Sequence, residues 1–180
     1  MSMELIQTIP VGSGGQASIT FSSIEADWTD LYLVVSGKST RTNAPRDAIK
    51  LQFNGVTSGY SSVYLEATGS ATDGLKFSSQ SQILFEHALS TNFSGLGNLF
   101  GSASIYISDY LSSQNKSVSS DQTAIRNSTD AHSAINASLS TVTSPITSIY
   151  LSPQHGDFTQ YSTASLYGIA SGSDGTTTVA

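Results

Sequence analysis

The sequence predicts an all-β fold, an antiparallel β-sandwich of jelly-roll type, and three observations lead to this prediction. Apolar and polar residues alternate with a period of two in short segments along the chain, as in strands that bury one face. Gly, Asn, Asp and Ser separate these segments at regular spacing, which is typical of sandwiches. No stretch keeps the ~3.6-residue period of an amphipathic helix.

The N-terminal segments establish the alternating pattern. Residues 4–11 form the first predicted strand, and residues 16–24 form the second, with Ile19 and Phe21 on one face. Residues 30–37 (DLYLVVSG) are a nearly continuous apolar run, which is expected of a central strand with both faces sheltered.

Two further strands flank a predicted turn. Residues 49–55 alternate and end in Asn-Gly, which favours a turn because both residues tolerate a positive φ. Residues 61–69 follow as the next strand, with Val63 and Leu65 on one face. Residues 80–90 fit either a strand or a short helix, and the strand is favoured because the segment alternates and lacks an N-cap.

The following segments are more polar. Residues 102–110 alternate clearly, whereas residues 116–127 and 131–142 are rich in Ser. We predict that these two polar segments are edge strands or the wet face of a sheet. Residues 146–153 form another strand that stops at a proline.

The last predicted strand, residues 158–170 (FTQYSTASLYGIA), contains no charged residue. A strand with two sheltered faces belongs inside a sheet, and pairing with residues 4–11 would bring the chain ends together. We therefore expect one sandwich domain over residues 1–170 and a flexible Gly/Ser/Thr tail over residues 171–180.

The composition limits the function classes. Only 11% of the residues are charged, against roughly 25% in an average domain, while 35 Ser and 19 Thr residues must coat much of the surface. Such hydroxyl-coated surfaces suit a protein that packs among copies of itself or is exposed on a particle. The net charge of −6 argues against non-specific nucleic-acid binding, which needs a Lys/Arg footprint.

Two further absences in the sequence narrow the expectations. There is no cysteine, so neither a disulfide nor a thiolate metal site can form. A signal-peptide pattern and an apolar run long enough to span a bilayer are also missing, so we expect a soluble protein with no export and no membrane partner.

The sequence shows no pattern of catalytic, cofactor-binding or metal-binding residues. A G-x-S-x-G elbow is absent. The glycine-rich segment 12–16 precedes a predicted strand rather than a phosphate-binding helix, and the three histidines are far apart. We therefore expect a protein that is not an enzyme and that has no cofactor and no metal.

Three residues are candidates for contact with a glycan or a partner: Trp28, Asp73 and His155. Trp28, the single tryptophan, lies in EADWTD, where it either stacks on a sugar or, as we favour, anchors one end of the sandwich. His155 lies in an HGD segment after a proline, which is part of a site or, as we favour, a simple polar turn.

Tyrosine residues recur beside the predicted strands. Tyrosine is amphipathic and enriched at protein interfaces. We therefore expect subunit contacts from some members of a set that comprises Tyr60, Tyr64, Tyr106, Tyr110, Tyr150, Tyr161 and Tyr167.

Four segments, residues 20–41, 49–70, 100–121 and 147–169, cover most of the chain. Their more distinctive pieces are YSS-Y-L after F-N-G, I-Y-I-x-x-Y, and the closing F-x-Q-Y-S-T-A-x-L-Y-G-I. In these segments the chain resembles small virion proteins of tailed bacteriophages from marine and freshwater environments, including phages of cyanobacteria. The shared pieces are structural signatures, and no functional residue carries over by position.

The resemblance implies a structural protein of the virion that is made in the cytoplasm of the host bacterium. We expect a capsid decoration (cement) protein that binds the assembled head and stabilises it as a homotrimer, in contact with the major capsid protein or other virion proteins. The alternative is a tail-fibre or receptor-binding module that recognises host surface glycans. A carbohydrate-active enzyme is a third alternative.

Overall fold

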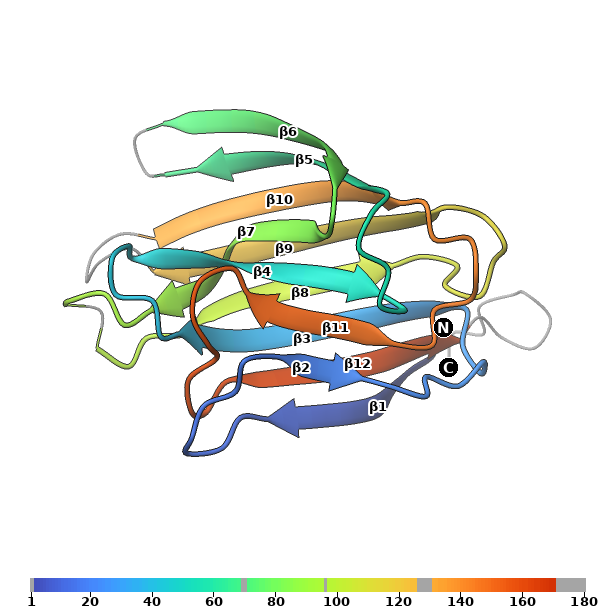
Figure 1. The fold of residues 1–180 in the computed structure, drawn as a ribbon, viewed down its shortest axis with the longest axis horizontal. Coiled ribbons are helices and arrows are strands. Elements are labelled where there is room, and N and C mark those ends of the chain that lie inside the picture. Colours follow the sequence, from blue (N-terminus) through green and yellow to red (C-terminus); the bar gives the residue numbers. More distant parts are fainter. Residues whose placement is uncertain (1, 69–70, 96, 126–130, 171–180) are drawn as a thin grey trace.

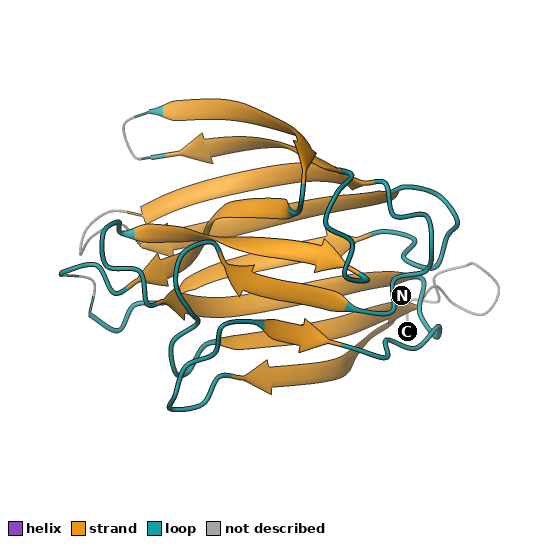
Figure 2. Ribbon diagram, viewed as in Figure 1, coloured by secondary structure: helices purple, strands orange, loops and turns teal. Residues whose placement is uncertain are grey.

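The computed structural model describes residues 2–68, 71–95, 97–125 and 131–170, and this part of the chain consists of strands and loops (Figures 1 and 2). The all-β prediction is confirmed. The strands are β1 (Ser2–Pro10), β2 (Ile19–Phe21), β3 (Asp30–Ser39), β4 (Arg46–Phe53), β5 (Tyr60–Ala67), β6 (Thr72–Gln80), β7 (Ile83–Thr91), β8 (Gly101–Ile107), β9 (Lys116–Ile125), β10 (Ala131–Ser140), β11 (Ile149–Pro153) and β12 (Thr163–Ala170).

The strands are arranged in two layers, as Figure 1 shows. The large sheet has the order β1-β12-β3-β8-β9-β10-β5-β6, and its pairings are antiparallel. The small sheet, β2-β11-β4-β7, is also antiparallel. The sheets join where the ends of β3 and β7 pair in parallel, with Lys38 opposite Ser90. This arrangement is a β-sandwich, and jelly-roll connectivity remains a prediction.

The hydrophobic core fills the space between the small sheet and the middle of the large sheet. Strand alternation turns one face of β3, β8 and β12 toward the inner face of β2, β11 and β4. Each large apolar side chain buried there stabilises the fold by about 1.5–3 kcal/mol. The fully buried side chains include Ile19, Phe21, Leu31, Leu33, Val35, Ile49, Leu51, Phe53, Ile105, Ile107, Leu151 and Leu166.

The predicted turn after β4 is present. Asn54 and Gly55 have φ values of 52° and 69°, so both adopt the left-handed conformation that the Asn-Gly pair favours. The Asn54 side chain also ties the turn to the loop before β11. Its Nδ2 donates to the carbonyl of Pro145 at 2.8 Å, and its Oδ1 accepts from the amide of Thr147 at 2.9 Å.

The first and last strands pair with each other, which is the condition under which the sequence places the chain ends close together. Ser2 of β1 lies opposite Ala170 of β12, so the two ends of the described chain are neighbours. β12 lies between β1 and β3, which confirms that residues 158–170 supply an interior strand. The strand prediction for residues 80–90 is also confirmed, because they contribute most of β7.

Trp28 packs on the backbone of β12. A Cβ atom at Gly168 would lie 2.1 Å from Cγ of Trp28, so the indole ring occupies the space that any larger residue at position 168 needs. The ring is partly buried and packs against the hydrophobic core. This contact supports the interpretation of Trp28 as an anchor.

Two segments differ from the sequence-based expectations. β6 is not predicted, because Leu75 and Phe77 are its only two apolar residues and most of its positions are exposed. It forms by pairing with β5, and a local pattern does not reveal such a tertiary pairing. β9 and β10 are interior strands of the large sheet, whose edges are β1 and β6. Of the two predicted alternatives the edge position is therefore wrong, whereas a wet face fits β9, whose outward Ser117 and Ser119 are exposed. The predicted tail, residues 171–180, lies outside the described residues.

Replacing Gly168 by alanine is expected to lower the free energy of unfolding by about 1–3 kcal/mol, because the added Cβ overpacks against Trp28. Gly14→Ala is the matched control, since nothing lies within 4 Å of a Cβ built there. Urea unfolding followed by the fluorescence of Trp28 measures both variants. Equal midpoints for Gly168→Ala and Gly14→Ala would contradict the packing of Trp28 on β12.

Candidate functional site

β10 and β5 carry large apolar side chains on the outer face of the large sheet. Ile135 and Leu139 of β10 are 58% and 41% exposed, and Val63 and Leu65 of β5 are 50% and 57% exposed. The inward positions of β10 are buried and mostly polar, as at Asn136. An uncovered outer face normally carries the polar residues and the inner face the apolar ones. The polarity of these two strands is therefore inverted.

The exposed apolar residues are contiguous. Ile135 lies directly opposite Leu65, and Ala137 lies directly opposite Val63. Residues that are opposite on neighbouring strands have Cβ atoms about 4.5–5.5 Å apart, so their side chains meet. We refer to Val63, Leu65, Ile135, Ala137 and Leu139 as the apolar patch. Contiguous exposed apolar surface of this kind marks interaction sites.

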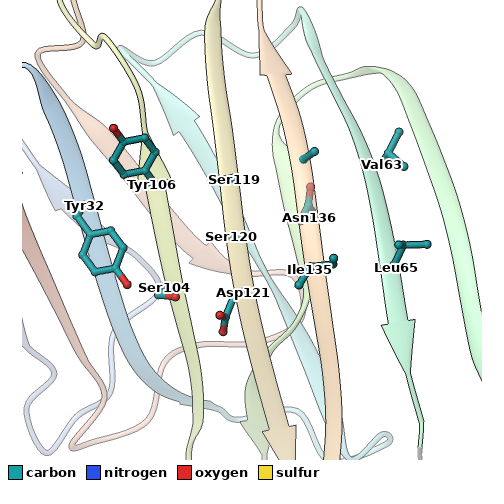
Figure 3. A pocket seen from close by; sticks show the side chains of 11 residues that line it. Tyr32, Val63, Leu65, Ser104, Tyr106, Ser119, Ser120, Asp121, Ile135 and Asn136 are labelled. Carbon is teal, nitrogen blue, oxygen red and sulfur yellow. The ribbon is translucent and has the colours of Figure 1, made fainter.

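A trough of about 480 Å³ lies beside the apolar patch on the same face (Figure 3). Tyr32 of β3 and Tyr106 of β8 form one wall, and the members of the apolar patch other than Leu139 form the other. The outward residues of β9 between them include Ser119 and Asp121. The short side chains of Ser104 and Ser119 line the space between the tyrosine rings and the aliphatic residues.

A row of tyrosines continues the outer face toward β1. Tyr106 lies opposite Tyr32, Tyr32 lies opposite Tyr167 of β12, and Tyr167 lies opposite Leu5 of β1. Each ring offers an apolar body and a hydroxyl group. The outer face therefore has an aromatic half and an aliphatic half, with the trough between them.

The charges in and near the trough are few. Asp121 is the one charged side chain among the described residues that line it. The Tyr106 hydroxyl donates to Oδ2 of Asp30 at 2.7 Å, and Oδ1 of Asp30 accepts from the amide of Asp109 at 2.7 Å. The hydrogen bond to Asp30, together with burial, raises the pKa of Tyr106 to about 12. The tyrosine thus stays neutral and fixed at the wall of the trough.

The arrangement is suited to binding. When a partner covers the apolar walls and aromatic rings, the burial of this surface makes the free energy of binding more favourable. The serine and tyrosine hydroxyls provide hydrogen bonds that orient the partner. A protein surface or a sugar meets this combination of groups.

The three candidate residues from the sequence do not come together. Trp28 lies against β12, whereas Asp73 lies on β6, and β3, β8, β9, β10 and β5 separate these strands in the large sheet. His155 follows β11 of the small sheet, where its Nδ1 lies 3.0 Å from Oδ1 of the buried Asp47. Its amide donates to the same carboxylate at 3.2 Å, which supports the interpretation of the HGD segment as a polar turn.

The apolar patch is the feature that sequence analysis missed. Val63 and Leu65 do share a face of β5, but that face is the outer one. Alternation shows which residues lie together and not which side is buried. Of the tyrosines expected at interfaces, Tyr106 and Tyr167 lie on the outer face, whereas Tyr60 is buried in the core.

Comparison of the chain with protein-family models gives no match. Comparison with curated proteins also gives no match. The part of the chain that the structure describes contains no helix that could cross a membrane.

The raised pKa of Tyr106 predicts a stability loss at high pH. Tyrosine in the unfolded chain ionises near pH 10, and Tyr106 in the folded chain ionises at about 12. Its contribution to stability is therefore complete below pH 10 and is lost as the pH rises toward 12. We expect the urea midpoint of the Tyr106→Phe variant to fall less between pH 9 and pH 11 than that of the unmodified chain.

Tyr161→Phe is the control for this measurement, because its ring is 73% exposed. It is expected to keep the pH dependence of the unmodified chain. An unchanged pH dependence in Tyr106→Phe would show that the bond to Asp30 has no effect on stability.

Proposed function

We propose that this protein is a structural component of a tailed-phage virion, a capsid decoration (cement) protein that binds the assembled head as a homotrimer. The observation that carries the proposal is the apolar patch on the outer face of the large sheet, together with the resemblance of the sequence to virion proteins. The partners are other copies of the chain and the major capsid protein or other virion proteins.

The apolar patch supports assembly for an energetic reason. Its four larger side chains are 41–58% exposed, and covering such side chains fully contributes about 1 kcal/mol each, which is half of the gain from complete burial. The patch, the trough and the tyrosine row together extend from β5 to β12. Specific interfaces bury about 800 Å² on each partner, and a face of this breadth suits such an interface.

The chemistry of the remaining surface supports the same function. Serine and threonine keep the molecule hydrated with few charges, so the strongest attraction between copies is expected at the apolar patch. A protein that binds only the assembled shell stabilises it by mass action. Bridging neighbouring subunits is therefore sufficient as a mechanism, and no reaction is required.

The second candidate function is a receptor-binding module for host surface glycans. The aromatic wall of the trough favours it, because Tyr32 and Tyr106 lie beside serine hydroxyls and the carboxylate of Asp121. Sugars stack on aromatic rings and accept hydrogen bonds from hydroxyl groups. In this alternative the trough, rather than the set of Trp28, Asp73 and His155, is the binding site.

Immunogold labelling of intact virions with an antibody to this chain tests the location. The cement function predicts gold over the head, and heads that lack the protein are expected to lose their DNA at a lower temperature. Gold at the tail supports the glycan-binding alternative, and a glycan array with Tyr32→Ala is then the next test. Absence of gold from virions that label well for another surface protein would contradict both functions.

The apolar patch has its own test. Ile135→Asp places a charge in the patch and is expected to weaken trimer formation or head binding by at least ~10-fold, since burying an unpaired charge is costly. Light scattering gives the mass of the free protein, and co-sedimentation with undecorated heads gives the affinity.

Thr20→Asp is the matched control, because Thr20 is exposed on β2 of the small sheet and does not belong to the outer face of the large sheet. It is expected to assemble like the unmodified chain. If Ile135→Asp also assembles like the unmodified chain, the patch is not the interface.

A further inference from the structure

A cluster of three metal-ligating side chains lies between the two layers, on the opposite side of the large sheet from the trough. One ligand atom each of Glu66, His87 and His132 lies within 4.8 Å of the other two. Glu66 belongs to β5, His132 to β10 and His87 to β7. The cluster therefore spans both sheets.

The two imidazole rings and the carboxylate already contact one another. The ring centroids of His87 and His132 are 5.1 Å apart, with the ring planes inclined at 49°. Nε2 of His87 makes a hydrogen bond with Oε2 of Glu66. Such contacts hold the three donors in one place without help from a flexible loop.

The cluster is closed to solvent except at the carboxylate. His87 and His132 are 1% and 2% exposed, and the Glu66 side chain is 13% exposed. Within the described residues, Nδ1 of His87 and Oε1 of Gln122 are buried without a hydrogen-bond partner. Gln122 lies on β9, opposite Ala134 of β10. Buried polar atoms in native proteins normally have a partner, and an ion is one explanation when none is seen.

Two histidine nitrogens and one carboxylate oxygen suit a divalent cation that is intermediate between hard and soft, such as zinc. Zinc is bound by histidine nitrogens and carboxylate oxygens at about 2.0–2.2 Å. Tetrahedral coordination places such donors about 3.3 Å apart, and the ligand atoms of these three side chains all lie within 4.8 Å of one another.

We propose that Glu66, His87 and His132 bind one Zn²⁺ ion that links β5 and β10 of the large sheet to β7 of the small sheet. The role is structural, because both histidines are closed to solvent and three different strands provide the ligands. The inner face of β10 next to His132 carries Ala134 and Asn136, which provide little apolar surface. Hydrophobic burial is weak there, and the ion supplies the connection between the layers. This inference is independent of the proposed function.

Zinc titration of the full chain without a polyhistidine tag tests the site. Isothermal titration is expected to show one Zn²⁺ per chain, and about 100-fold excess over the dissociation constant is expected to raise Tm by about 5–10 °C. A second readout is Co²⁺, which gives intense visible absorption when it is bound in a tetrahedral site and weak absorption when it is hydrated.

Three substitutions locate the ligands. Glu66→Gln and His132→Gln are expected to weaken Zn²⁺ binding by at least ~100-fold and to abolish the intense Co²⁺ spectrum. His155→Gln is the control, because His155 contacts Asp47 and lies outside the cluster. Its binding and spectrum are expected to match those of the unmodified chain.

Circular dichroism establishes that each variant is folded before it is titrated. Glu66→Gln is expected to keep the fold, because Glu66 is the most exposed of the three ligands. The proposal is overturned if the unmodified chain binds no zinc when the zinc concentration is well above the protein concentration. It is also overturned if a folded Glu66→Gln variant binds as tightly as the unmodified chain, or if His155→Gln removes binding.

Discussion

Apolar packing between the small sheet and the middle of the large sheet is the interaction on which the rest of the molecule depends. The chain contains no cysteine and few charged residues, so neither disulfides nor ion pairs can replace this packing. The small sheet is narrower than the large one, and Figure 1 shows β5 and β6 extending beyond it. The hydrophobic core therefore ends before the large sheet does.

This mismatch explains the properties of β5 and β10. Where the core ends, the inner face of the large sheet meets β7 through histidine, glutamate, asparagine and serine side chains. The aliphatic residues of the same two strands lie outward, where only a partner can cover them. A polar interior cluster and an apolar exterior patch are thus the two sides of one stretch of sheet. The candidate metal site stabilises the inside, and the proposed interface uses the outside.

Much of the fold could be predicted from the sequence, because alternation and turn residues are local signals. The Asn-Gly turn, the strand character of residues 80–90 and the interior position of the charge-free last strand follow from them. The interior positions of β9 and β10 could not be predicted, since serine-rich strands normally lie at an edge or on a wet face. β6 could not be predicted either, because it is a strand through its pairing with β5 and its own residues carry only a weak strand pattern.

The candidate sites were harder to predict from the sequence than the fold. Trp28, Asp73 and His155 attract attention as residue types, yet the fold places them on different elements. The apolar patch depends on which side of β5 and β10 faces outward, and alternation does not determine this. Glu66, His87 and His132 are far apart in the sequence, and the three-dimensional arrangement of β5, β7 and β10 is what brings them together.

The position of β12 has a consequence for how the chain is made. β12 lies between β1 and β3, which are synthesised first, while β12 itself is synthesised last among the strands. Until residues 163–170 leave the ribosome, β3 keeps an unpaired edge and β1 lacks the partner that it has in the finished sheet. The large sheet is therefore completed only after residues 163–170 have been synthesised, and its many distant pairings make its folding slow compared with helical proteins of similar size. During that interval the unpaired edges are exposed to other nascent chains. β1 and β3 carry apolar residues such as Met3, Leu5 and Val34, which stay partly exposed even in the finished fold, so the interval carries a risk of aggregation.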